Sequence, residues 1–190
     1  MMSMKRLFIA VPLDEATKEK LAGILHELKY VGFGAKIEPI DNIHITLKFL
    51  GNTEIKRIDI LNTVLNEIAH SFSSFTIQPK GFGFFPNAKY ARICWLGIEE
   101  PTKTLFSIQN EIEQRLSKEG FVKENREFKA HLTLVRIKNP GTTSKLVEKI
   151  EQCAEIHFDA MKVKYFSLHE SILKPQGAHY SCLNKYYLKE

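Results

Sequence analysis

Asp41–Gly51 reads DNIHITLKFLG, and the alternation within this stretch decides how the surrounding chain folds. Every second residue is apolar, which predicts a β-strand with one buried face, formed by Ile43, Ile45, Leu47 and Phe49. The other face would carry His44, Thr46 and Lys48. One imidazole beside a hydroxyl is weak evidence for a site, because many strands have an incidental polar face.

A second copy of the pattern occurs in FKAHLTLVRI, residues 128–137. The tetrapeptide HLTL at 131–134 follows HITL at 44–47 by 87 positions (131 − 44). Again the polar pair, His131 and Thr133, falls on one face and the leucines fall on the other. Two such tetrapeptides, one in each half of the chain and each in an apolar strand, predict a shared site.

Similar elements are expected around the two motifs. Helical periodicity predicts helices over about 14–30, 54–70 and 102–118, and a short helix that ends near residue 153. Strand patterns occupy 6–13, 42–51, 73–86, 90–99, 127–137, 156–171 and 178–189. We therefore expect an α+β fold in a single domain, residues 1–190. It would consist of two lobes related by a pseudo-twofold, each an antiparallel sheet packed with helices, around a central groove that carries the two HxTx motifs.

The bulk composition is that of a globular protein with a basic balance: 190 residues, 44% hydrophobic, net charge +5. A positive charge suits a polyanionic partner but does not require one. The three cysteines are scattered in apolar surroundings, which indicates buried thiols in a reducing compartment rather than disulfides or zinc ligands. No apolar run reaches the roughly 20 residues that a membrane helix needs. We expect a cytoplasmic monomer that does not interact with a membrane.

The motifs together resemble those of a known family. HITL, the FLG that follows it, HLTL with its LVR, and HESILKPQGAHY near the end of the chain resemble the two-histidine phosphoesterase superfamily. Within it, the chain is most similar to the RNA 2′,3′-cyclic phosphodiesterases, also called 2′-5′ RNA ligases. The resemblance covers essentially the whole chain, and one departure is Ala130, where the family commonly has proline. The family resemblance implies that His44 is the proton donor and that His131 is the proton acceptor. It also implies that the partner is an RNA end with a 2′,3′-cyclic phosphate.

The residue types suit this chemistry. Opening a cyclic phosphate needs an activated water on one side of phosphorus and a proton for the departing ribose oxygen on the other. Histidine titrates near neutrality, so one neutral and one protonated imidazole supply both functions. The Thr46 and Thr133 hydroxyls can donate to phosphate oxygens and stabilise the developing charge. The scheme needs no cofactor and no metal, and the sequence has no HExxH motif or clustered Asp/His set.

Other residues are weaker candidates for substrate contacts. Strict alternation from His131 places Val135 on the site face instead of Arg136, unless a β-bulge or the strand end turns the arginine inward to the phosphate. The alternative for Arg136 is a solvated charge. Aromatic rings for stacking a terminal base are Phe8, Phe49 and Tyr180, and each has the alternative of a core position. Lys48 falls on the same strand face as His44 and Thr46, so it is a candidate for a phosphate contact. The alternative is that its side chain ends in solvent. The remaining histidines, His26, His70, His157, His169 and His179, are interpreted as surface or structural.

Three functions are compatible with these patterns. The first is an RNA-end 2′,3′-cyclic phosphodiesterase that yields a 2′-phosphomonoester and has weak reversible 2′-5′ ligase activity. The second is a phosphodiesterase for a small cyclic nucleotide or an ADP-ribose cyclic phosphate. The third is a non-catalytic module that binds RNA ends. Intact histidine and threonine in both motifs argue against the third, and the positive charge favours the first over the second.

Overall fold

The computed structural model describes residues 3–29, 35–100, 103–138, 144–153, 155–175 and 177–190. The helices are α1 (Glu15–Lys29), α2 (Ile58–Ala69), α3 (Thr104–Lys118) and α4 (Ser144–Gln152), with short 3-10 turns at η1 (Ile40–Asn42) and η2 (Ile55–Arg57). The strands are β1 (Met4–Pro12), β2 (Ala35–Ile37), β3 (His44–Glu54), β4 (Phe75–Phe85), β5 (Ile93–Glu99), β6 (His131–Ile137), β7 (Met161–Val163), β8 (Tyr165–Lys174) and β9 (Gly177–Tyr187).

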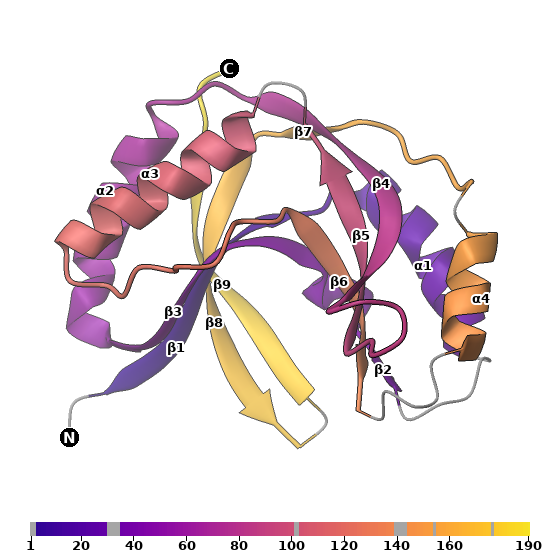
Figure 1. Cartoon of the computed structure of the whole chain (residues 1–190). Helices are drawn as coiled ribbons and strands as arrows, with labels where there is room; N and C mark the ends of the chain where they lie inside the picture. The colour runs from indigo at the N-terminus through magenta and orange to yellow at the C-terminus, as the bar shows by residue number, and fades with distance from the viewer. Residues whose placement is uncertain (1–2, 30–34, 101–102, 139–143, 154, 176) are drawn as a thin grey trace.

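These strands form one curled antiparallel sheet in the order β7-β4-β5-β6-β3-β1-β8-β9, with β2 paired to β6. The two motif strands meet in the middle, where Ile45 of β3 pairs with Leu132 of β6. Helices α2 and α3 lie on one side of this junction, and α1 and α4 lie on the other (Figure 1). The predicted α+β class with antiparallel strands in two related halves is confirmed, and the two expected sheets are joined into one.

Each half of the chain contributes a strand to the opposite side of the sheet. Strand β4, from the first half, pairs with β5, whereas β8, from the second half, pairs with β1. We call β3, β1, β8 and β9 the His44 lobe, and β6, β5, β4 and β7 the His131 lobe. Helix α3 follows β5 in the chain but packs on β3 of the His44 lobe. The two lobes are therefore interlocked, and neither is one continuous stretch of chain.

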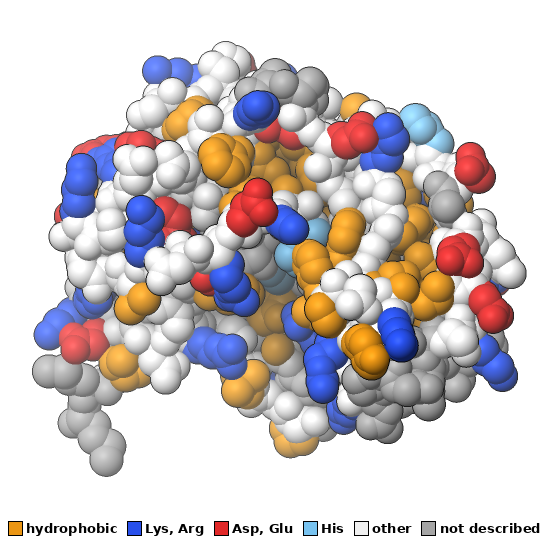
Figure 2. Space-filling model, in the orientation of Figure 1, with side chains coloured by type: hydrophobic (Ala, Val, Ile, Leu, Met, Phe, Trp, Pro, Cys, Tyr) orange, Lys and Arg blue, Asp and Glu red, His pale blue; other side chains and the backbone are white. Residues whose placement is uncertain are grey.

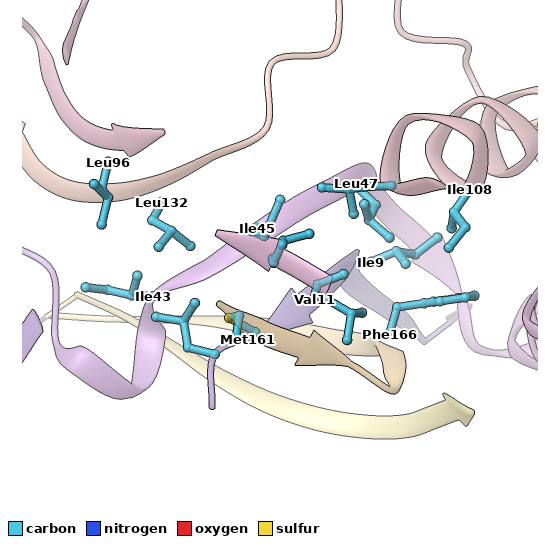
Figure 3. Packing of buried hydrophobic residues seen from close by; sticks show 14 of the residues in the cluster. Ile9, Val11, Ile43, Ile45, Leu47, Leu96, Ile108, Leu132, Met161 and Phe166 are labelled. Carbon is cyan, nitrogen blue, oxygen red and sulfur yellow. The ribbon is translucent and has the colours of Figure 1, made fainter. Parts of the chain in front are cut away.

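The core lies on the face of the central strands that carries the apolar residues of the two motifs (Figure 3). Ile45, Leu47 and Leu132 are at most 3% exposed. They share the core with side chains from neighbouring elements, including Ile9, Val11, Leu96, Ile108 and Phe166. Full burial of each such side chain stabilises the fold by about 1.5–3 kcal/mol. This packing fixes which face of each motif strand is buried, and so which face is left for a site.

Some element boundaries differ from those expected. The expected helix from residue 54 begins only at Ile58, because β3 continues to Glu54 and a 3-10 turn follows. The strand expected over 156–171 is divided into β7 and β8, because these two segments pair with different neighbours, β4 and β1. The expected end of the first helix at Tyr30 and the expected start of the third at Thr102 lie outside the described residues. In the part of the chain that the structure describes, no helix is long and apolar enough to cross a membrane.

Candidate active site

Each motif strand contains a β-bulge at the same position of its motif. In the β1–β3 pairing, Ile9 is opposite Lys48 but Ala10 is opposite Thr46, so Leu47 is an additional residue. In the β5–β6 pairing, Cys94 is opposite Val135 but Trp95 is opposite Thr133, so Leu134 is the additional residue. A bulge reverses the alternation of the residues that follow it.

The bulges change the predicted faces of both strands. Phe49 was expected on the buried face of β3, and that expectation is wrong: its side chain is 64% exposed, and its ring lies 6.2 Å from that of Phe8. Arg136 is exposed as well, whereas Val135, which alternation placed on the site face, is buried. A bulge is thus the feature that turns Arg136 out of the core.

The two motif histidines have the same backbone contact. Nδ1 of His44 lies 2.7 Å from the carbonyl oxygen of Asn42, and Nδ1 of His131 lies 2.6 Å from that of Lys129. A carbonyl oxygen only accepts, so each Nδ1 carries the proton and donates it. Nε2 of each ring therefore remains for proton transfer to or from a bound molecule.

An aromatic cluster supports His44. Its ring stacks on Phe8 at 4.8 Å between centroids, and the ring of His169 stacks on Phe8 at 5.1 Å. The two imidazoles lie side by side, 6.5 Å apart and 12° from parallel. Tyr180 meets both Phe8 and His44 edge-on, at 4.8 and 5.4 Å. Phe8 is only 2% exposed, so it holds these rings in place and offers little surface on which a base could stack. Of the two positions considered for Phe8, the structure shows the buried one.

Burial and nearby charge lower the pKa values of both motif histidines. Desolvation by burial lowers the pKa of His44 to about 4, and the charges of His169, Arg136 and His131 add to this effect. The pKa of His131 is lowered by burial first and by Arg136 second. In each case the backbone hydrogen bond opposes the shift. Arg136 therefore acts electrostatically on both imidazoles.

Arg136 is oriented by a residue that the sequence patterns did not single out. Its Nε donates to Oε1 of Glu38 at 2.6 Å. Glu38 is 8% exposed, whereas the Arg136 side chain is 51% exposed. The Glu38 charge also raises the pKa of Tyr180, after the larger effect of burial. Glu38, Arg136 and Tyr180 thus form one electrostatic group beside the histidines.

The two motif threonines are half-buried, and Thr133 is paired with Trp95 of β5. Trp95 and Phe85 surround His131: their ring centroids lie 6.4 and 5.1 Å from the imidazole. Figure 2 shows histidine side chains at the bottom of a hollow in the middle of the molecule, with Lys and Arg side chains around it. The arrangement can bind an anion between two imidazoles that are able to exchange protons with it.

Lys48 does not belong to this site. The structure contradicts both predictions for its side chain, a phosphate contact and a solvent-exposed end. Its Nζ donates to Oε2 of Glu113 at 2.6 Å and to the carbonyl oxygen of Val122 at 2.8 Å. The Lys48 and Glu113 side chains are only 2% and 5% exposed. The bulge at Leu47 moves Lys48 to the core face, where it forms a buried ion pair with helix α3.

Four residues of the site escaped the sequence patterns: Glu38, Phe85, Trp95 and His169. His169 was interpreted as surface or structural; it lies beside His44, and its Nε2 is 2.8 Å from the Ser167 hydroxyl. The sequence pattern that could have identified it is the alternation of Ser167, His169 and Ser171, which places three polar side chains on one face of the strand. His157 and His179 are exposed, and His70 contacts the carbonyl of Asn66 at the end of α2.

No group of three or more His, Cys, Asp or Glu side chains is arranged to hold a metal ion among the described residues. Two of the cysteines, Cys94 and Cys153, are buried free thiols as expected, but Cys182 is exposed. Cys182 is opposite His169 on β9 and therefore faces the same side of the sheet.

Comparison with known proteins agrees with the duplicated geometry. A family model described as LigT like Phosphoesterase matches twice, at residues 11–95 and 96–180. The chain is 33% identical to the RNA 2′,3′-cyclic phosphodiesterase of Methanothermobacter thermautotrophicus, over 96% of this chain and 98% of that protein. It is 35% identical to the protein of the same name from Archaeoglobus fulgidus, over 94% and 97%.

Solved structures show the same fold. TT0787 of Thermus thermophilus has a TM-score of 0.81 at 25% identity, covering 97% of this chain and 98% of that one. Escherichia coli LigT in apo form has a TM-score of 0.74 at 21% identity, covering 99% of each chain. With two matched repeats that together span most of its length, the chain belongs to the LigT-like phosphoesterase family.

Proposed function

We propose that this enzyme hydrolyses terminal 2′,3′-cyclic phosphates of RNA to 2′-phosphomonoesters by general acid–base catalysis with His44 and His131. The observation that carries the proposal is the matched pair of imidazoles, each with Nδ1 held by the carbonyl two residues earlier. Relatives over 30% identical along nearly the whole chain are named RNA 2′,3′-cyclic phosphodiesterase, which supports the same substrate here.

The chemical step follows from the two free Nε2 atoms. Nε2 of His131 takes a proton from water as the water oxygen bonds to phosphorus. The bond between phosphorus and the ribose 3′-oxygen breaks, and Nε2–H of His44 protonates that oxygen. The phosphate stays on the 2′-oxygen, and the proton balance is restored when His131 and His44 re-equilibrate with solvent. Each proton transfer is worth about 10²- to 10⁴-fold in rate.

Thr46, Thr133 and Arg136 would stabilise the charge on the phosphate. The threonine hydroxyls donate to non-bridging oxygens, and the guanidinium supplies a positive charge whose effect reaches both histidines. Phe49 and Tyr180 would contact the terminal base; the exposure of Phe49 beside Phe8 and the edge contact of Tyr180 with His44 support this role. Weak joining of a 2′,3′-cyclic phosphate to a 5′-hydroxyl end is the same step run with a ribose hydroxyl in place of water.

The acid function of His44 depends on the substrate. A pKa of about 4 leaves this imidazole neutral at pH 7 in the free protein. The negative charge of a bound cyclic phosphate favours the protonated form and raises that pKa. His44 would therefore take up its proton as the substrate binds, and the assignment of acid and base to the two histidines is part of the proposal.

One assay tests this function. The protein is incubated with an oligonucleotide that ends in a 2′,3′-cyclic phosphate, with EDTA present, and the product isomer is identified by chromatography. We expect a 2′-phosphate. A 3′-phosphate product, or turnover of ADP-ribose cyclic phosphate with no turnover of RNA ends, would overturn the proposal.

A further inference from the structure

A row of paired residues leads from Thr46 across the His44 lobe to the edge strand. Thr46 is opposite Ala10, Ala10 is opposite Ser167, and Ser167 is opposite Lys185. Side chains at directly opposite positions lie on the same face of a sheet. Neighbouring strands are about 4.8 Å apart, so Lys185 lies roughly 14 Å across the sheet from Thr46. The face that carries the site therefore continues to β9.

Two tyrosines and Lys185 form a cluster at the outer end of this face. Tyr165 is opposite Tyr187, with ring centroids 5.3 Å apart. Nζ of Lys185 lies 4.8 Å from the Tyr165 ring centroid. Tyr187 is 60% exposed, and Lys185 is exposed as well. Tyr165 raises the pKa of Lys185 above its usual value.

The chemistry of the cluster matches single-stranded RNA. Sites for single strands combine cationic groups that follow the backbone with aromatic rings on which bases stack. A single exposed aromatic ring is ordinary on a protein surface. Here, however, the exposed ring and the ammonium share one sheet face with Thr46, which points to a ligand that extends outward from the reacting phosphate.

We propose that Tyr187 and Lys185 bind nucleotides upstream of the cyclic phosphate: a base stacks on Tyr187, and Lys185 contacts a backbone phosphate. This inference rests on the proposed function and locates the path of the RNA strand on β8 and β9. Stacked nucleotides advance about 3.4 Å each, so about four of them span the 14 Å from Thr46. A mononucleotide does not reach the cluster, whereas a pentanucleotide does.

The test compares two substrates and two variants. Hydrolysis of a mononucleotide 2′,3′-cyclic phosphate and of a pentanucleotide with the same terminus is measured for wild type, Tyr187→Ala and Lys185→Ala. We expect Tyr187→Ala to lower kcat/KM on the pentanucleotide by roughly 5- to 100-fold, the usual effect of removing one stacking ring. For Lys185→Ala, the slope of log binding constant against log salt concentration should fall by about 0.7. Both variants should hydrolyse the mononucleotide like wild type.

Matched controls come from helix α3, which packs on the opposite face of the sheet. Phe106 is an exposed aromatic ring there and Lys118 an exposed lysine, and Phe106→Ala and Lys118→Ala should leave both substrates unaffected. Binding of a labelled pentanucleotide with a 2′-phosphate is followed by fluorescence anisotropy, independently of turnover. Unchanged binding and turnover in Tyr187→Ala and Lys185→Ala, or equal losses on both substrates, would overturn this inference alone. Absence of cyclic phosphate opening by wild type would instead overturn the proposed function.

Discussion

Phe49 and Arg136 occupy equivalent positions in the two halves of the sheet. Each is five residues after its motif histidine (49 − 44 and 136 − 131), follows a bulge at the motif leucine, and is exposed. The backbone is thus duplicated, but one half presents an aromatic ring and the other a guanidinium. A nucleotide end has the same asymmetry, with a base at one side and an anionic phosphate at the other.

Removing either motif histidine should abolish most activity. His44→Ala and His131→Ala should each lower kcat for cyclic phosphate opening by about 10²- to 10⁴-fold, because a proton transfer is lost. Since the two act as a unit, the double variant should be little worse than either single variant. The control is His179→Ala, which removes an exposed histidine of β9. Near wild-type kcat in either single variant, with the fold intact by circular dichroism, would contradict the mechanism.

The pH profile should reflect the lowered pKa values. The base must be neutral and the acid protonated, so activity falls below the pKa of the former and above that of the latter. Burial and Arg136 lower both values from 6.5, that of His44 to about 4. The bell-shaped profile of kcat/KM, which reports the free enzyme, should therefore have its maximum below pH 6.5. The profile of kcat should lie at higher pH, because the bound phosphate raises both values. A kcat/KM maximum above pH 8 would be inconsistent with these shifts.

Sequence patterns predicted the duplicated strands and the central pair of histidines, because alternation over HITL and HLTL is local and regular. They missed what depends on strand pairing. The alternation rule assumes an unbroken period of two, so the bulges at Leu47 and Leu134 reversed the predicted positions of Phe49 and Val135. His169 lies beside His44 only because β8 pairs with β1, which lies more than 150 residues earlier in the chain.

Chelation should leave the activity unchanged. Proton transfer by two imidazoles and charge stabilisation by Thr46, Thr133 and Arg136 require no divalent ion. Initial rates measured before and after prolonged dialysis against EDTA should agree. Loss of activity on chelation that Mg²⁺, Mn²⁺ or Zn²⁺ restores would show that a metal takes part.

The buried ion pair between Lys48 and Glu113 should be important for stability and not for catalysis. Lys48→Met leaves the Glu113 carboxylate buried without its partner, which costs about 3–5 kcal/mol. Urea unfolding should show this loss, and the double variant Lys48→Met with Glu113→Leu should recover much of it. At low temperature, where the variant is folded, kcat/KM should stay within a few-fold of wild type. A Lys48→Met variant with unchanged unfolding and lost activity would place Lys48 at the phosphate after all.

Arg136 should act on the reacting phosphate itself, whatever the length of the RNA. Arg136→Ala should therefore lower kcat/KM on the mononucleotide and on the oligonucleotide by the same factor, about 10- to 100-fold for a lost charge-assisted contact of 1.5–3 kcal/mol. Loss of its positive charge should also raise the pKa values of both histidines and move the kcat/KM maximum to higher pH.

Glu38→Gln keeps the shape of the partner but weakens its hold on the guanidinium, so it should raise KM with a smaller effect on kcat. Arg136→Lys retains the charge and should therefore preserve the position of the pH maximum while recovering part of kcat/KM. If Arg136→Ala impaired only the oligonucleotide and left the pH profile in place, the guanidinium would contact the RNA backbone away from the reacting centre.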